Sequence, residues 1–309
     1  GSDHPLFRVP VLYYDDVSPP VRSCLLVIEM LDIEVVYRFV DLFKGAQLHA
    51  EFLKINPAHT VPTLVHDDLI LTDSHAILMY LCDISTNEAR ETLFPSNFKD
   101  RLQVMNKLFF DCSILFRRDS DLMSEIVRKG FDNVDLQYHE RKILEAYSMM
   151  EHFLTDNQTY MVGSNLTIAD ISLLTTLSTV DLMFPVESES GANEKWPLLC
   201  KWFRVMKSLP HYRINQDGLN KLRAVIEKLG KFEFPTPPPL EFNDNEKNRF
   251  YCLFYIKFSN FIQKHINTKY CIASSLENIL MLLLLMTHVT VSWNIELRRT
   301  KVLCFENLT

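Results

Sequence analysis

Two short groups of residues between positions 56 and 76 carry the clearest chemical pattern in the 309-residue chain. Pro62 stands where a loop meets a predicted strand, a place where proline sacrifices no ladder hydrogen bond. If the Val61–Pro62 bond is cis, Val61 can turn its backbone N–H and C=O toward a ligand. Asp73 and Ser74 precede an apolar run with helical spacing, which marks a helix start that attracts anions. The stretch is either a peptide clamp with a carboxylate seat or an ordinary hairpin and helix cap.

Ser18 is the candidate for chemistry on sulfur. Ser18 suits an N-cap and Pro19 suits the first turn of the helix that follows. A thioredoxin would carry Cys-x-x-Cys at this place, and its absence argues against disulfide exchange. A serine hydroxyl can instead donate a hydrogen bond to a thiolate held beside it, although the alternative is a plain helix cap.

Two kinds of structure position these residues. The first part of the chain predicts the order β-α-β-α-β-β-α, which is the thioredoxin-like plan, over residues 9–88. The second part predicts an all-α bundle over residues 95–235, and Thr167-Ile-Ala-Asp170 there is a capping box that we interpret as a folding element. The predicted strands are 11–14, 35–40, 62–65 and 69–71. The main predicted helices are 74–84, a bent 97–128, 134–155, 171–183, 196–209 and 217–229.

One face of the helix predicted at 97–128 has an acid in its middle. Helical spacing places six residues in one stripe: Phe116, Asp119, Ser120, Met123, Ser124 and Val127. An apolar stripe is normally core, where an uncompensated carboxylate costs several kcal/mol. Asp119 therefore pairs with a neighbour such as Arg117 or Arg118, or it faces a cleft and binds a ligand hydroxyl. The two arginines sit around the helix from Asp119, so spacing does not favour the pair.

Composition narrows the class of protein. A net charge of −7 and a pI near 5.8 argue against nucleic-acid binding. The seven cysteines are scattered without the paired spacing of a metal site, which indicates a reduced, cytoplasmic protein and no metal.

Residues 236–309 form a tail of different character. A Thr-Pro-Pro-Pro run at 236–239 breaks the chain, and the apolar core at 279–286 is too short for a span of about 20 residues. The tail is a membrane-surface segment, a disordered tail or a read-through of the gene, and we favour the last two, so membrane contact through it is not expected.

Several motifs together resemble the insect delta/epsilon glutathione S-transferases over roughly residues 10–235. They are Ser18-Pro-Pro, His59-Thr-Val-Pro62, Asp73-Ser-His-Ala-Ile77 and Leu166-Thr-Ile-Ala-Asp170. The stretches 115–121 and 175–185 are similar to epsilon-class members that serve ecdysteroid synthesis. The resemblance implies the glutathione S-transferase fold, glutathione as co-substrate and a homodimer.

The resemblance also implies a role for each matching residue. Ser18 would hydrogen-bond the glutathione sulfur, and His59 would contact the glycyl end. Val61, beside Pro62, would pair with the cysteinyl backbone. The γ-glutamyl group would be held by Asp73 and Ser74, with His75 nearby. Family members often carry Glu and Arg where this chain has Asp73 and His75, which shortens one anchor and removes a fixed charge from the other.

A hydrophobic second site is implied as well. Asp119 would receive a steroid hydroxyl there. The lining would come from Pro19, Leu42, Phe43, Phe116, Ser120, Met123, Ser124, Val127, Thr179 and Leu222.

These roles define an expected mechanism. Only the thiolate attacks well, and a free thiol titrates near ~8.5. Lowering its pKa by about two units requires about 2.7 kcal/mol, which one or two charge-assisted hydrogen bonds would supply. The resemblance thus implies a glutathione transferase with a steroid-accepting pocket that serves ecdysteroid biosynthesis. The alternative is a largely non-catalytic, glutathione-dependent sterol or steroid carrier.

Overall fold

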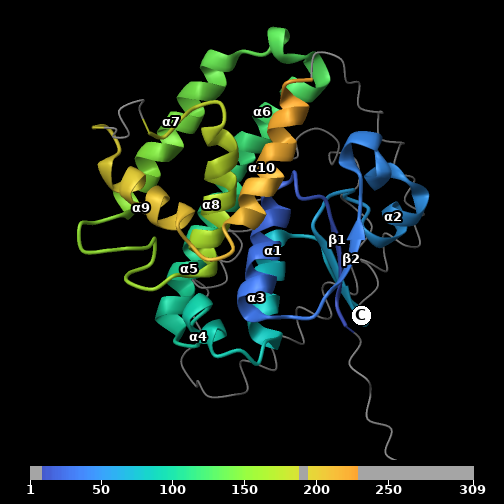
Figure 1. Cartoon of the computed structure of the whole chain (residues 1–309), viewed down its shortest axis with the longest axis horizontal. Helices are drawn as coiled ribbons and strands as arrows, with labels where there is room; N and C mark the ends of the chain where they lie inside the picture. Colours follow the sequence, from blue (N-terminus) through green and yellow to red (C-terminus); the bar gives the residue numbers. More distant parts are fainter. Residues whose placement is uncertain (1–8, 188–193, 229–309) are drawn as a thin grey trace, which may run out of the picture. The chain divides into compact units, whose positions relative to one another are not determined.

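The computed structural model describes residues 9–187 and 194–228, all within one compact unit (Figure 1). The predictions for the tail at 236–309 lie outside the described residues. None of the helices in the described ranges combines the length and the apolar character that a membrane span requires.

The first part of the chain has the predicted thioredoxin-like plan. Its sheet has the order β2-β1-β3-β4, with β1 parallel to β2 and antiparallel to β3. Strand β4 pairs antiparallel with β3. The elements are β1 (Val11–Tyr14), α1 (Pro19–Leu31), β2 (Val36–Phe39), α2 (Ala50–Ile55), β3 (Thr63–His66), β4 (Leu69–Leu71) and α3 (Ser74–Ile84).

The second part is helical, as predicted. The helix expected at 97–128 bends at a π-helical turn, Asp111–Leu115, which separates two α-helices. The last helix begins at Arg213, four residues before the predicted start at Asp217. The predicted start was therefore too late, and Gly218 lies inside the helix. The elements are α4 (Ala89–Leu93), α5 (Phe98–Phe110), α6 (Phe116–Lys129), α7 (Leu136–Phe153), α8 (Ile168–Asp181), α9 (Pro197–Lys207) and α10 (Arg213–Ile226).

Helix α8 joins the two parts. Its residues are buried from Ile168 to Val180, and they contribute to both hydrophobic cores. The capping box at its start is present, because Asp170 Oδ2 accepts the Thr167 N–H at 3.0 Å. Asp170 Oδ1 also accepts the Trp202 Nε1–H at 3.0 Å, so this acid is a folding element, as interpreted. Helix α1 packs against α3, α8 and α10 and therefore lies between the sheet and the bundle (Figure 1).

Helix α10 approaches the start of α1 very closely at Gly218. A Cβ added there would lie 2.2 Å from the Asp16 carbonyl oxygen and 2.6 Å from Arg22 Cδ. The glycine is needed because a backbone oxygen cannot move aside as a flexible side chain can.

We predict that Gly218→Ala lowers the free energy of unfolding by about 1–3 kcal/mol, because the methyl group forces α10 away from the loop before α1. Urea unfolding measures the change. Asn220→Ala, at an exposed position of the same helix, is the control and should change stability by less than about 0.5 kcal/mol. Equal stability of Gly218→Ala and wild type would contradict the close contact.

Candidate active site at the junction of the two domains

Ser18 stands at the start of α1 with its hydroxyl unused. It is the N-cap residue, and the Val21 and Arg22 N–H groups bond to its carbonyl oxygen. Its side chain makes no capping hydrogen bond, and the residue is partly exposed. The plain-cap alternative for the hydroxyl is therefore wrong, and Oγ is available at the positive end of the helix dipole.

Asp15 fixes the loop that presents Ser18. Only 3% of its surface is exposed. Its carboxylate accepts the Val17 N–H at 3.3 Å and the Leu42 N–H at 3.1 Å. Burial raises the pKa of this carboxyl above its usual range, although the two backbone bonds oppose the rise. Asp15 thus holds Leu42 beside the loop, a role that sequence reasoning missed.

Val61 lies two residues before β3 begins, beside the strand that leads to the Ser18 loop. The Val61–Pro62 bond is cis, as the clamp requires. Strand pairing sets Thr63 opposite Tyr13, next to the point where the loop to Ser18 begins. Within the described ranges, the backbone N–H and C=O of Val61 make no hydrogen bond. Both groups are therefore free to pair with an extended peptide.

A buried amide holds the loop that carries Val61. Asn56 Nδ2 donates to the Thr60 carbonyl at 2.9 Å and to Thr63 Oγ1 at 2.9 Å. Asn56 Oδ1 accepts the Ala58 N–H at 2.9 Å. His59 lies inside this loop with a positive φ of 48° and is half-buried. Sequence reasoning did not identify Asn56 as the organiser of the loop.

Asp73 and Ser74 form the second half of the candidate site. Asp73 caps α3 by accepting the His75 N–H at 2.9 Å and the Ala76 N–H at 3.1 Å, which confirms the predicted helix start. Cys24 Sγ lies 4.0 Å from the Ser74 carbonyl, so α3 begins against the second turn of α1. Six residues of helix separate Cys24 from Ser18 and span about 9 Å, close to the roughly 10 Å of an extended tripeptide.

His75 is held as a cation between two acids. Its Nε2 lies 3.1 Å from Asp111 Oδ2, and its Nδ1 lies 3.3 Å from Asp73 Oδ1. Burial alone would lower the pKa of His75, but the neighbouring Asp111, Asp73 and Cys112 outweigh it and raise the pKa to about 12. The histidine therefore carries a positive charge at neutral pH.

Arg22 connects the loop, α8 and α10. It is fully buried, and each of its three side-chain nitrogens donates a hydrogen bond. Nε donates to Asn215 Oδ1 at 2.8 Å, Nη1 to the Val17 carbonyl at 2.7 Å, and Nη2 to the Thr175 carbonyl at 3.2 Å. Burial lowers its pKa to about 10, so it remains charged at neutral pH. Sequence reasoning missed the role of Arg22, although an arginine on the inner face of an apolar helix could have indicated it.

Asp119 is the buried acid that the sequence singled out. The pairing alternative is wrong, because Arg117 binds Asp121 at 3.0 Å and Arg118 binds Glu145 at 2.9 Å. Asp119 is 2% exposed and makes no hydrogen bond to another described residue. Burial raises its pKa to about 7, although the charge of Arg22 works against the rise. Among the described residues, this buried carboxyl therefore has no hydrogen-bond donor.

Most residues of the stripe around Asp119 lie at the rim of the helical core rather than inside it. Its other members are half-buried or, at Ser124, exposed: Phe116, Ser120, Met123, Ser124 and Val127. The core face of α6 consists instead of Leu122 and Ile126 together with Asp119. Met123 and Val127 pack on the rim of the helical core. The expectation that such a stripe is normally core is therefore wrong for most of its members.

The remaining predicted lining residues divide into two groups. Leu42 and Phe43 are half-buried, whereas Pro19 and Leu222 are buried. Thr179 is also buried, and its hydroxyl is engaged inside the protein: it accepts from Arg22 Nη2 at 2.5 Å and donates to the Thr175 carbonyl at 2.9 Å. Thr179 supports Arg22, and its predicted ligand contact stays a prediction.

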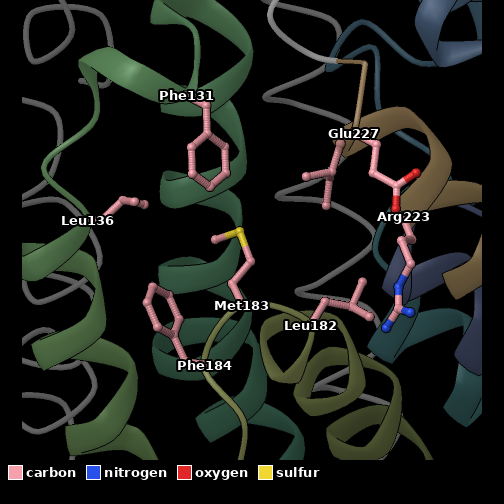
Figure 2. A pocket seen from close by; sticks show the side chains of 8 residues that line it. Phe131, Leu136, Leu182, Met183, Phe184, Arg223 and Glu227 are labelled. Carbon is pink, nitrogen blue, oxygen red and sulfur yellow. The ribbon is translucent and has the colours of Figure 1, made fainter.

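The helical domain also contains an apolar pocket of about 410 Å³ (Figure 2). It opens between the ends of α8 and α10 and the connection from α6 to α7. None of the predicted lining residues borders it, although Arg223 follows Leu222 and Leu182 lies three residues after Thr179. Its lining residues are Phe131, Leu136, Leu182, Met183, Phe184, Arg223, Ile226 and Glu227. They lie at helix ends, where helical periodicity carries no signal for a shared cavity.

We predict that Asp119→Asn changes how stability depends on pH. The folded pKa of about 7 exceeds the ordinary 3.8, so the folded state holds the proton longer and wild-type stability falls as pH rises between these values. The variant cannot lose a proton, so its stability relative to wild type should rise by about 2–3 kcal/mol from about pH 5 to about pH 8. Urea unfolding across pH measures this, and parallel curves for the two proteins would contradict it.

Comparison with known proteins agrees with this geometry. Residues 12–89 match the glutathione S-transferase N-terminal domain, and residues 119–210 match the C-terminal domain. Glutathione S-transferase 1 of Manduca sexta is 36% identical over 207 residues, which cover 66% of this chain and 91% of that protein.

Two solved structures are similar over most of their length. A glutathione transferase homolog from Drosophila mojavensis with bound glutathione is 34% identical, with 71% of this chain and 96% of that chain covered and a TM-score of 0.66. An epsilon-class glutathione S-transferase from the housefly, Musca domestica, is 34% identical, with 72% and 99% covered and a TM-score of 0.64. The chain therefore belongs to the insect glutathione S-transferases, a family of enzymes that use glutathione as co-substrate.

Proposed function

We propose that this glutathione transferase activates the glutathione thiol at Ser18 and accepts a hydroxylated steroid or sterol-like molecule at Asp119. We further propose that it serves ecdysteroid biosynthesis in the cytoplasm, in the manner of the epsilon-class enzyme Noppera-bo, which the stretches 115–121 and 175–185 resemble. The observation that carries the steroid proposal is the buried Asp119 carboxyl without a hydrogen-bond partner among the described residues.

The glutathione half of the proposal uses Ser18 and Val61, whose hydroxyl and backbone groups have no partner among the described residues, together with the start of α3. The unbonded hydroxyl of Ser18 and the N-terminus of α1 would stabilise the thiolate. The free backbone groups of Val61 would pair with the cysteinyl residue, next to Pro62. The Ser74 end of α3 would hold the γ-glutamyl group, with Asp73 and His75 beside it, and His59 would contact the glycyl end. The protein would then act by activating sulfur and holding it near an electrophile.

The steroid half depends on a polar group in an apolar wall. A ligand hydroxyl that donates to Asp119 would remove the cost of leaving that acceptor unpaired. The half-buried residues of the α6 stripe would border the ligand together with Leu42 and Phe43. The apolar pocket at the ends of α8 and α10 offers further room of the size that small-molecule sites usually have. A ligand without the hydroxyl would be rejected strongly.

We also propose that the chain forms a homodimer through α5. Three large apolar side chains are exposed on this helix at helical spacing: Phe98 at 75%, Leu102 at 46% and Phe109 at 55%. Large apolar side chains exposed together on one helix are typical of protein interfaces.

The second candidate function is a carrier that binds glutathione and a steroid but turns over little. The same unpaired Asp119 supports it, because ligand selection does not require catalysis. The two functions differ in what Ser18 contributes, so one variant separates them.

We predict that Ser18→Ala slows glutathione conjugation of a model electrophile by about 10- to 100-fold, because one charge-assisted hydrogen bond to the thiolate is lost. The apparent pKa of the rate should rise by about one to two units, while steroid affinity is unchanged. Stopped-flow kinetics across pH and steroid titration measure these values, with Ser96→Ala at an exposed site as control. A negligible rate in the wild type would support the carrier instead.

We predict that Asp119→Ala weakens binding of a hydroxylated steroid by roughly 10- to 100-fold, because the bond to a charged acceptor is lost. Calorimetry measures the affinity, with Asp121→Ala on the exposed side of the same helix as the matched control. The rate with a small electrophile that lacks a hydroxyl should not change. Unchanged steroid affinity in Asp119→Ala would end the proposal for Asp119.

A further inference from the structure

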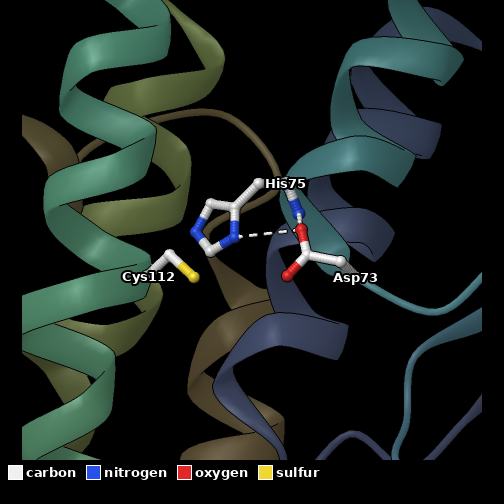
Figure 3. A group of neighbouring side chains, drawn as sticks. All are labelled: Asp73, His75 and Cys112. Carbon is white, nitrogen blue, oxygen red and sulfur yellow. Dashed lines mark hydrogen bonds and ion pairs between the residues drawn. The ribbon is translucent and has the colours of Figure 1, made fainter. Parts of the chain in front are cut away.

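Three side chains with metal-binding atoms meet where α3 begins against the π-helical turn. They are Asp73, His75 and Cys112, and Figure 3 shows the carboxylate, the imidazole and the thiol turned toward one another. One ligand atom from each lies within 4.8 Å of the others. The residues are 39 positions or fewer apart in the chain, but their spacing matches no metal motif, so the cluster could not be predicted from the sequence.

His75 Nδ1, the imidazole nitrogen in this cluster, is buried but makes no hydrogen bond. His75 is 4% exposed, and its Nδ1 is buried without a hydrogen-bond partner, although Asp73 Oδ1 lies 3.3 Å away. The other nitrogen, Nε2, lies 3.1 Å from Asp111 Oδ2, and Asp111 Oδ2 also accepts from Ser172 Oγ at 2.5 Å. The ring is therefore anchored at one nitrogen while the other points at a carboxylate and a thiol.

We infer that Asp73, His75 and Cys112 bind a zinc-like divalent ion through one oxygen, one nitrogen and one sulfur. The 3.3 Å between His75 Nδ1 and Asp73 Oδ1 is close to the distance between two ligands of a tetrahedral ion with bonds of about 2.0–2.1 Å. Asp73 and Cys112 are exposed, so their side chains can close the remaining distance. Asp73 Oδ1 also accepts the first N–H groups of α3, which holds this carboxylate beside the ring.

The surroundings suit this ion. A carboxylate behind a ligating histidine fixes the ring and raises its basicity, which is the part that Asp111 plays here. Mixed nitrogen, oxygen and sulfur ligands favour zinc over magnesium or calcium. Three protein ligands leave a fourth position open, as in reactive rather than purely structural zinc sites. Asp73 and Asp111, which lie on either side of the ring, also attract a metal cation.

The site has a consequence for glutathione. This step rests on the proposed function, in which Asp73 and Ser74 hold the γ-glutamyl group. A metal ion on Asp73 would occupy the place of the γ-glutamyl ammonium, so the ion and glutathione would exclude each other. Zinc would therefore inhibit the transferase through a residue, Cys112, that takes no part in the reaction.

The test uses cobalt(II) as a spectroscopic probe on the full chain. Wild type should show the near-ultraviolet charge-transfer absorption of a thiolate bound to cobalt, and zinc should abolish it. Cys112→Ser should lose this absorption and bind zinc about tenfold or more weakly. Cys252→Ser, which removes a thiol outside the described residues, is the matched control and should keep the absorption. A fluorescent zinc-competition assay gives the affinities.

The remaining arms separate the metal site from the enzyme. S-methylglutathione, which carries the γ-glutamyl group but no free thiol, should displace cobalt from wild type. Zinc should inhibit conjugation by wild type but not by Cys112→Ser.

Cobalt absorption that persists in Cys112→Ser, or is missing in wild type, overturns the metal site. Cobalt binding that depends on Cys112 in a protein without conjugating activity keeps the metal site and rejects the proposed function. If Cys112→Ser does not fold, wild-type Cys112 is alkylated instead, and mass spectrometry confirms the modified residue. Alkylation must then abolish the cobalt absorption. Cobalt absorption that persists after alkylation overturns the site.

Discussion

The buried guanidinium of Arg22 holds the two domains in register around the candidate site. Its hydrogen bonds reach the carbonyl of Val17, the amide of Asn215 and the backbone of α8 at Thr175. Breaking a buried charged network of this kind usually costs about 3–5 kcal/mol. The fit is close enough that Gly218 of α10 admits no side chain where it passes the loop. The loop before Ser18 therefore cannot shift unless α8 and α10 shift with it.

This constraint would keep the two proposed sites, which differ in character, in a fixed relation to each other. On the sheet side, the backbone groups of Val61 and the hydroxyl of Ser18 have no hydrogen-bond partner among the described residues, and the proposed peptide would pair with them. On the helical side, Asp119 is buried in an apolar wall within the field of Arg22, which favours its ionised form while burial opposes it. The pKa of Asp119 is thereby raised to about 7, and in the proposed function its carboxyl would accept a hydrogen bond from the ligand hydroxyl.

Much of this arrangement could be predicted from local sequence, because local rules decide it. The strand-initial Pro62, the cap at Asp73 and the capping box at Thr167 are all read from neighbours within a few positions. Asp119 was recognised because an acid interrupts a helical stripe.

The features that were missed depend on partners far along the chain. Arg22 bonds to Asn215 across 193 positions, and Asp111 meets Ser172 across 61. The apolar pocket joins helix ends from three places in the sequence, and the cluster of Asp73, His75 and Cys112 exists only because the π-helical turn faces α3 (Figure 3). No pattern within one helix or strand encodes such meetings. The role of Gly218 was missed for the same reason, since its constraint is a carbonyl that belongs to another element.

A crystal structure of the protein with glutathione and a hydroxylated steroid is the most direct test of the central claim. The account predicts the glutathione sulfur within hydrogen-bonding distance of Ser18 Oγ and the steroid hydroxyl bonded to the Asp119 carboxyl. A sulfur directed away from Ser18, or an Asp119 carboxyl bonded to Arg22 while the steroid lies elsewhere, would contradict it.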